Sequence, residues 1–238
     1  FDARALTDFK GHRYDDALAW VERRLGLEDA ISDPDHLSDL FGESVPFYAA
    51  AGRLLEARRV AERGDEIASR LTTHHRVHGV SYLLELEELL GGWERVEELT
   101  ERTERCVAEN LGTPCIRNMR SLLLCAVASA ERGRGRESRK LEASAESLGM
   151  TGHDQPLSAP RTRIALARGD RDRLAELAAL PFEAGGSWHG VGQSAARLDA
   201  LAALRAVEQV EIEAPPYLSG RSYLEPFALR ALGIVRGD

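Results

Sequence analysis

One histidine cluster in the sequence has a spacing that could bind a metal ion: His74, His75 and His78. On an α-helix, His74 and His78 lie four residues apart on one face, as two zinc ligands do. His75 would point about 100° away and cannot readily join them. A zincin has a catalytic glutamate directly after its first histidine, and here that position is His75. Partly exposed histidines near a helix start are therefore favoured over a metal site, and a metal-dependent hydrolase using His74 and His78 is kept as an alternative.

A second group of residues could bind an anion at the start of a helix. Thr113 and Pro114 are typical of a helix start, because a threonine can cap the first N–H groups and proline has the φ of the first helical position. Arg117, Asn118 and Arg120 then fall in the first two turns, beside the positive end of the helix dipole. They could hold a carboxylate or a phosphate there.

Two further arginines occupy the equivalent place one repeat later along the chain. Arg161 and Arg163 could serve the same ligand, or all these arginines could bond carboxylates of neighbouring helices such as Glu87 or Glu88. Both interpretations stay open at the level of sequence. The predicted ligand- or partner-binding residues are Arg117, Asn118, Arg120, Arg161, Arg163, His78 and Tyr82.

The remaining reactive residue types do not assemble into a catalytic pattern. Cys106, Cys115 and Cys125 are an odd number without a CxxC pair, and each sits in an apolar helical context, which indicates small buried side chains in a reducing compartment. His189 has no serine or cysteine partner at a recognisable spacing, and no GxxxxGK[ST] phosphate loop occurs. No catalytic residue, metal ligand or cofactor is predicted.

The elements that must position these residues are helices. The chain of 238 residues is 43% hydrophobic and 29% charged, as in a folded globular protein. Alanine, leucine, glutamate and arginine recur throughout, and β-branched runs bounded by turn residues are almost absent. We therefore predict an all-α protein.

The charge balance argues against two classes of partner. With a formal net charge of −8 the chain lacks the basic surface that nucleic-acid binding usually needs, although a local basic groove could exist within an acidic total. The longest near-apolar run, 122–130, is far shorter than the roughly 20 residues that span a bilayer. The chain opens with Phe1 inside a helical pattern. It is predicted to be a segment of a longer, cytoplasmic polypeptide without nucleic-acid or membrane partners.

Turn glycines reveal an internal repeat. Gly11, Gly52, Gly92, Gly133 and Gly169 are separated by 36 to 41 residues, and each is followed by a small or apolar residue: Ala17, Ala57, Val96, Ser138 and Leu174. A helix–glycine turn–helix unit at such a period is typical of an α-solenoid. We predict an elongated, right-handed α-solenoid of about five antiparallel hairpins over 1–184, with a C-terminal helical pair at 185–238 that continues or caps it.

Several runs also resemble a known group of proteins. Gly11 to Ala17 resembles the turn of a tetratricopeptide repeat, with its glycine, aromatic and alanine. Other runs resemble the tetratricopeptide-like C-terminal region of large bacterial signalling ATPases, in which a nucleotidyl cyclase or DNA-binding domain precedes the helical repeats. These runs are Leu71–His78, Gly92–Val96, Thr113–Ser121, Leu148–Met150 and Tyr223–Leu232. The resemblance covers most of the chain and implies a sensor or interaction role.

The function predicted from sequence is thus a non-catalytic helical-repeat scaffold that binds a protein, a peptide, a ligand or another domain of its own parent chain. Within a bacterial signalling regulator it would act as the sensor or interaction segment. Besides the hydrolase, the alternative is an accessory domain of a DNA-binding transcriptional regulator.

Overall fold

The structure is a computed structural model that describes residues 2–150, 154–182, 189–218 and 222–237. These residues form α-helices and two short 3-10 helices and include no β-strand, which confirms the all-α class predicted from the sequence. The predicted domain boundary at 184/185 lies outside the described residues. The helices are α1 Asp2–Lys10, α2 Tyr14–Leu25, η1 Glu28–Ala30, α3 Pro34–Gly42, α4 Val45–Ala50, α5 Leu54–Ala68, α6 Thr73–Leu90, α7 Trp93–Glu109, α8 Ile116–Glu131, α9 Gly135–Glu146, α10 Asp154–Arg168, α11 Arg171–Ala178, α12 Gly190–Leu204, α13 Val207–Glu213, η2 Pro215–Tyr217 and α14 Glu225–Arg236.

One turn geometry joins the helices of six successive pairs: α1–α2, α4–α5, α6–α7, α8–α9, α10–α11 and α12–α13. In each turn one residue has a left-handed backbone, with φ between 57° and 74°. At Gly133, for example, its N–H donates to the Ala130 carbonyl (2.9 Å) and the next N–H, of Arg134, donates to the Ser129 carbonyl (2.8 Å). These two bonds form a Schellman motif, which satisfies carbonyls at the end of a helix. The left-handed residues are His12, Gly52, Gly91, Gly133, Gly169 and Arg205, at separations of 36 to 42 residues.

Only some of the glycines expected at these turns adopt the left-handed backbone. Gly52, Gly133 and Gly169 have the left-handed φ, whereas Gly11 and Gly92 lie one position away from the residue that does. In the first turn that residue is His12, whose Nδ1 lies 3.0 Å from the Tyr14 hydroxyl. The sixth turn uses Arg205 and was not anticipated, since residues with a Cβ seldom adopt positive φ.

Each turn also fixes where its second helix approaches the first. The fifth residue after the left-handed position is at most 3% exposed in every pair, as expected for a position at which two helices pack closely. The small or apolar character of this position was recognised for five of the pairs, and Val210 is the sixth. The residues are Ala17, Ala57, Val96, Ser138, Leu174 and Val210.

The apolar spacing over about 35–51 predicts one helix that Pro46 should bend or split, and the structure divides this region into two helices. Asp33 caps its start, because its carboxylate accepts a hydrogen bond from the Asp35 N–H at 2.9 Å, and Pro34 occupies the first helical position. Pro46 lacks an N–H and cannot continue the hydrogen-bond ladder, so α3 ends at Gly42 and α4 begins at Val45. The predicted break at Pro46 is confirmed.

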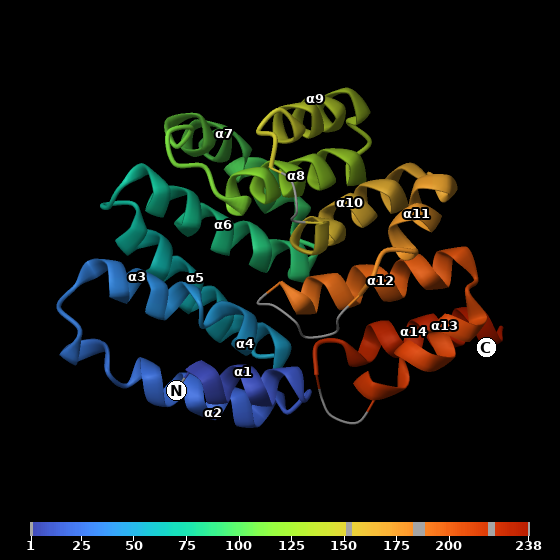
Figure 1. Cartoon of the computed structure of the whole chain (residues 1–238), viewed down its shortest axis with the longest axis horizontal. Helices are drawn as coiled ribbons and strands as arrows, with labels where there is room; N and C mark the ends of the chain where they lie inside the picture. The colour runs from blue at the N-terminus through green and yellow to red at the C-terminus, as the bar shows by residue number, and fades with distance from the viewer. Residues whose placement is uncertain (1, 151–153, 183–188, 219–221, 238) are drawn as a thin grey trace.

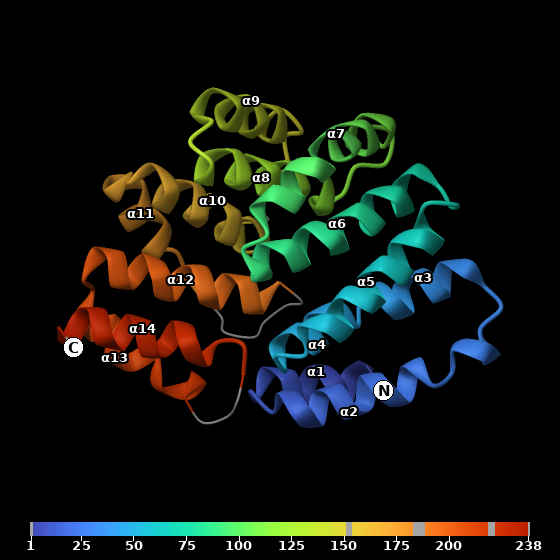
Figure 2. The same cartoon turned by 180° about the vertical axis from the view of Figure 1, so that it is seen from behind.

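The helix pairs follow one another around a ring-like path, and the last ones return to the first (Figures 1 and 2). The Tyr223 N–H donates to the Ala50 carbonyl at 3.1 Å, and the Tyr223 hydroxyl donates to the Leu89 carbonyl at 2.5 Å. On the same side the His12 and Tyr217 rings pack edge to face at 5.1 Å. The C-terminal helices therefore close the array against α1, α4 and α6.

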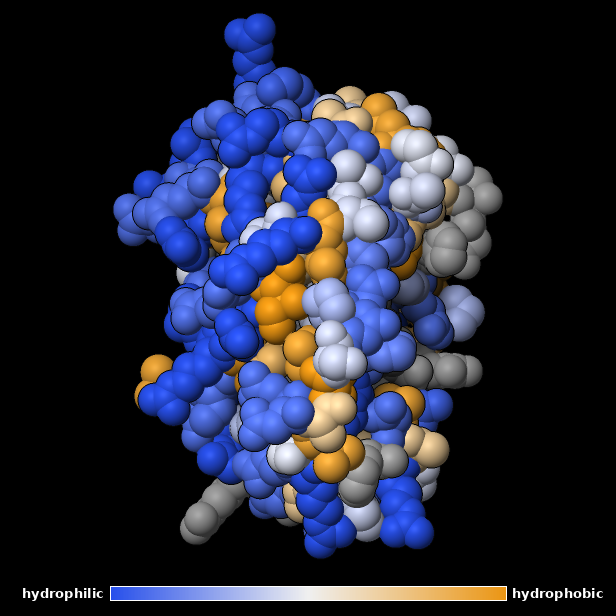
Figure 3. All heavy atoms as spheres, turned by 90° about the vertical axis from the view of Figure 1, so that its left-hand side faces the viewer, coloured by the Kyte–Doolittle hydropathy of each residue, from blue (hydrophilic) through white to orange (hydrophobic). Residues whose placement is uncertain are grey.

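This closure makes the molecule shorter than the elongated array that the repeat predicted. The accessible surface is 11271 Å², close to the roughly 10,600 Å² expected for a compact monomer of this mass. On the face at the left of Figure 1, hydrophobic residues form a strip between predominantly hydrophilic ones (Figure 3). Among the described residues, none of the helices has the length and apolar character needed to cross a membrane.

The two kinds of left-handed turn residue should respond oppositely to substitution. Gly133→Ala places a Cβ on a backbone with φ of 74° and should destabilise the fold by about 1 kcal/mol. Arg205→Gly removes that strain at an exposed position with φ of 57° and should stabilise the fold by about 0.5 kcal/mol. Urea unfolding of both variants measures the change, and shifts of the same sign would contradict the assigned turn geometry.

Candidate functional site

Charged side chains that are mostly or fully buried gather where α6, α8, α10 and the residue before α12 meet. Their side chains expose between 1% and 14% of their surface. Three arginines face two glutamates, which leaves one excess positive charge if the histidine is neutral. We call this group the interior ion cluster, and its members are Glu85, Glu88, Arg117, Arg120, Arg163 and His189.

Glu88 is the centre of one half of the interior ion cluster. Its carboxylate accepts a hydrogen bond from the Arg120 guanidinium at 2.8 Å and another from Arg163 Nε at 3.1 Å. Arg120 also donates to the Pro156 carbonyl at 2.6 Å, at the start of α10. Because the Glu88 and Arg120 side chains are only 1% and 2% exposed, these bonds supply the pairing that buried charges require.

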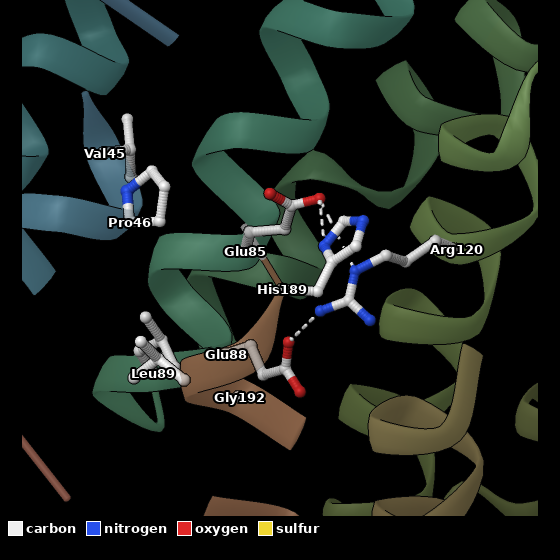
Figure 4. A pocket seen from close by; sticks show the side chains of 9 residues that line it. Val45, Pro46, Glu85, Glu88, Leu89, Arg120, His189 and Gly192 are labelled. Carbon is white, nitrogen blue, oxygen red and sulfur yellow. Dashed lines mark hydrogen bonds and ion pairs between the residues drawn. The ribbon is translucent and has the colours of Figure 1, made fainter. Parts of the chain in front are cut away.

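Glu85 forms the other half of the cluster. One carboxylate oxygen lies 3.5 Å from Arg120 Nε and 3.7 Å from His189 Nδ1 (Figure 4). The same oxygen lies 3.2 Å from Arg117. Burial raises the pKa of Glu85, against the lowering effect of Arg117 and Arg120. The pKa of His189 lies well below its ordinary value, first because of burial and then because of the same two arginines. His189 is therefore neutral at pH 7.

The interior ion cluster has no room for a ligand. The cavity between Glu85, Glu88, Arg120 and His189 has a volume of about 20 Å³, which is enough for one water molecule. The close-up shows these side chains directed at one another rather than into an open space (Figure 4). The cluster thus ties neighbouring helices together.

The predicted arginines are accordingly divided between two environments. Arg117, Arg120 and Arg163 belong to the interior ion cluster and bond carboxylates of α6, as the structural interpretation of the sequence expected. Arg120 and Arg163 bond Glu88 and Arg117 bonds Glu85, whereas Glu87 pairs with Arg58 at 2.5 Å. Arg161 is separate from them and pairs with Glu146 at 2.9 Å on the outer surface.

Asn118 has a local structural role at the start of α8. Its side-chain oxygen accepts hydrogen bonds from the Cys115 N–H and from the Asn110 side chain, both at 3.1 Å. The Cys115 sulfur accepts from the third backbone N–H of the helix in return, which completes a capping box. Asn118 is fully buried in this arrangement.

His78, Tyr82 and Arg117 do meet at a cavity. It has a volume of about 390 Å³ and lies between α1–α4 on one side and α6 and α8 on the other. The Arg117 guanidinium lies 4.5 Å from the centre of the Tyr82 ring and donates to the Ser81 hydroxyl at 2.6 Å. Burial raises the pKa of Tyr82 to about 12, so its hydroxyl is neutral at pH 7. We call this space the inner cavity; it is lined by Asp2, Leu6, Arg24, Asp39, Gly42, Glu43, Pro46, Phe47, His78, Tyr82 and Arg117.

The histidines at the start of α6 separate as predicted. His75 Nε2 lies 2.9 Å from the Asp35 carboxylate and His75 Nδ1 lies 2.7 Å from the Thr72 hydroxyl, so His75 is held away from the other two. His74 and His78 have ring centres 4.4 Å apart. Cys115 lies beside them, and the ligand-type atoms of these three side chains are within 4.8 Å of one another.

Three of the residues gathered here were missed by reasoning from the sequence: Cys115, Glu85 and His189. The sequence did contain a signal for Cys115 and for Glu85. Glu85 and Glu88 on α6 have the same three-residue spacing as Arg117 and Arg120 on α8, so the two pairs can meet across adjacent repeats. Cys115 precedes α8 as Thr72 precedes α6, and equivalent ends of stacked hairpins lie together. His189 carries no such signal, because its position follows from the ring closure.

Comparison with known proteins finds no matching family model, no matching curated protein and no matching solved structure. The resemblance to the tetratricopeptide-like region of signalling ATPases therefore stays a prediction. Any statement about function rests on the geometry of the described residues.

Removing one arginine from the interior ion cluster should be far more damaging than removing the outer one. Arg120→Met leaves Glu85 and Glu88 buried with an incomplete set of partners and should destabilise the fold by about 3–5 kcal/mol. Arg161→Met, the matched control, breaks a pair whose glutamate is 55% exposed and should cost less than about 1 kcal/mol. Chemical denaturation measures both, and equal losses would refute the structural role of the cluster.

Acidification from pH 7 to pH 5 should destabilise the fold through His78. Burial, then the Arg117 charge, then His74 and His75 lower the pKa of His78 from 6.5 to about 3 in the folded protein. Below pH 6.5 the unfolded chain takes up a proton that the folded chain does not accept until about pH 3. Stability is thus fully present above pH 6.5 and falls with pH, by about 2 kcal/mol at pH 5 from this group.

Urea unfolding in the presence of a chelator tests this linkage. His78→Gln should show a shallower loss of stability between pH 7 and pH 5 than the wild type, while His36→Gln on the exposed surface of α3 should not. The raised pKa of Glu85 contributes with the opposite sign but is common to all three proteins. Identical pH profiles for the wild type and His78→Gln would show that His78 is not the group responsible.

Proposed function

We propose that this chain is a non-catalytic helical-repeat scaffold that binds a protein or peptide segment in its inner cavity. The single observation that carries the proposal is that His78, Tyr82 and Arg117, predicted as binding residues, line one cavity of about 390 Å³. That volume is within the usual range of ligand pockets. The metal-dependent hydrolase and the accessory domain of a DNA-binding regulator stay predictions.

The recurring turn supports an assignment to repeat architecture. Six pairs share one Schellman turn and one buried contact position at a nearly constant separation, as expected for stacked tetratricopeptide-like hairpins in a right-handed superhelix. Such arrays bind through shape and rigidity rather than through reaction chemistry. On the resemblance of its sequence we also propose that the chain is the sensor or interaction segment of a larger bacterial signalling regulator that works in the cytoplasm.

The walls of the inner cavity suggest the chemistry of the bound segment. Leu6, Phe47 and the Tyr82 ring offer apolar and aromatic surface. Asp39 and Glu43 are exposed at the same cavity, and both act electrostatically on Tyr82. An apolar side chain with a neighbouring lysine or arginine would bury its apolar part against the aromatic surface and keep its charge beside the carboxylates.

Fluorescence anisotropy with short labelled peptides tests this proposal. Peptides that carry phenylalanine or leucine next to lysine should bind saturably, and the same peptides with glutamate in place of lysine should bind at least tenfold more weakly. Asp39→Lys reverses a charge at the cavity and should weaken binding of the basic peptides at least tenfold.

The matched control separates local recognition from the overall negative charge. Glu208→Lys on α13 makes the same change in net charge at an exposed position outside the cavity and should leave affinity unchanged. If both reversals weaken the peptide equally, attraction is non-specific and the inner cavity is not the site. Absence of saturable binding by any peptide of this type would overturn the proposed chemistry.

A further inference from the structure

Two histidines and a cysteine from adjacent helix pairs form a group of metal-ligating type. His74 and His78 come from the first two turns of α6, and Cys115 is the residue that caps α8. All three side chains are partly exposed, so an ion could reach them from solvent. Their ligand atoms lie within 4.8 Å of one another.

One distance between two ligand atoms of the group already matches the distance expected around a bound metal ion. His78 Nε2 lies 3.6 Å from Cys115 Sγ. In a tetrahedral zinc site with Zn–N of about 2.0–2.1 Å and Zn–S of about 2.3 Å, the nitrogen–sulfur separation is about 3.6 Å. An ion could therefore bridge these two atoms without moving the helices.

Neighbouring backbone groups orient His74 and Cys115 for metal binding. His74 Nδ1 lies 3.3 Å from the Thr113 carbonyl oxygen. A carbonyl oxygen can only accept, so Nδ1 carries the proton and Nε2 keeps its lone pair, which is the outer-shell arrangement usual for ligating histidines. At Cys115, the capping box aims a backbone N–H of α8 at the sulfur, which complements the negative charge of a metal-bound thiolate.

The neighbouring groups limit the set to three protein ligands. His75 is held by Asp35 and Thr72, away from the other two histidines. Arg117, which acts electrostatically on His78, has its charge offset by Glu85 at 3.2 Å. Three ligands leave the fourth tetrahedral position for water or for an atom of a bound molecule.

We propose that His74, His78 and Cys115 form a binding site for a borderline-soft divalent cation of the Zn²⁺ type. One thiolate and two imidazoles favour such ions over Mg²⁺ or Ca²⁺, which prefer oxygen. The site would link α6 to α8 and thus fasten two adjacent helix pairs at their outer ends. His78 also lines the inner cavity, so the metal site would border the surface proposed to bind a peptide, and no reaction is assigned to it.

Titration of reduced, tag-free, metal-free protein with Co²⁺ tests the site. The wild type should bind one equivalent, with the thiolate-to-cobalt charge-transfer absorption and the intense visible bands of tetrahedral Co²⁺, and one equivalent of Zn²⁺ should abolish both. Cys115→Ser should lose the charge-transfer absorption, and His74→Ala should weaken Co²⁺ binding at least tenfold. Serine is a good helix cap, so Cys115→Ser keeps the start of α8 intact.

Two control variants replace a cysteine and a histidine that lie outside the proposed site. Cys106→Ser replaces a buried thiol on α7, and His36→Gln replaces an exposed imidazole on α3; both should bind Co²⁺ as the wild type does. The melting temperature of the wild type should rise on addition of Zn²⁺ and that of Cys115→Ser should not. Survival of the charge-transfer absorption in Cys115→Ser, or absence of saturable Co²⁺ and Zn²⁺ binding by the wild type, would overturn the proposal.

Discussion

The pairing of buried charges across helices α6, α8 and α10 is the constraint on which the arrangement of the repeats depends. Glu88 is satisfied only if Arg120 and Arg163 both reach it, and these arginines belong to two successive helix pairs. A shift of one residue would move a side chain by about 100° around its helix and leave a charge unpaired in the interior. Apolar contacts tolerate small displacements better than ion pairs do. The interior ion cluster therefore specifies the register of α6, α8 and α10 more strictly than the apolar core alone would.

The interior ion cluster also accommodates the start of α12, the helix that brings the chain back toward its first helices. His189, the residue before α12, is inserted beside Glu85 in a neutral state, which avoids a further positive charge among three arginines. An added Cβ at Gly192 would lie 3.4 Å from the Glu88 carboxylate, which places the start of α12 directly beside the interior ion cluster. Arg117 connects this interior to the inner cavity, since it pairs with Glu85 and packs on Tyr82.

Much of the local structure could be predicted from the sequence, because it follows from residues near one another in the chain. The break at Pro46, the cap at Asp33 and the turns at Gly52, Gly133 and Gly169 belong to this class. The helix start predicted at Thr113–Pro114 is wrong by two residues, because Cys115 caps α8 and the helix begins at Ile116. The left-handed His12 and Arg205 could not be predicted, because such residues adopt that conformation only when the surrounding helices impose it. The insertion of His189 could not be read from spacing, because it depends on how the ring closes.

Closure of the ring by Tyr223 changes how the molecule should lose its structure. In a linear repeat array each unit contacts only its neighbours, and the terminal units fray first. Here the backbone of Tyr223 bonds to Ala50 and its hydroxyl to Leu89, so the last helices are attached to the second and third pairs. Opening either end breaks contacts with both halves of the chain, which gives the array the cooperativity of an ordinary globular domain. The same long-range contacts must be made before the array is complete, so rapid local hairpin formation would be followed by a slower closing step.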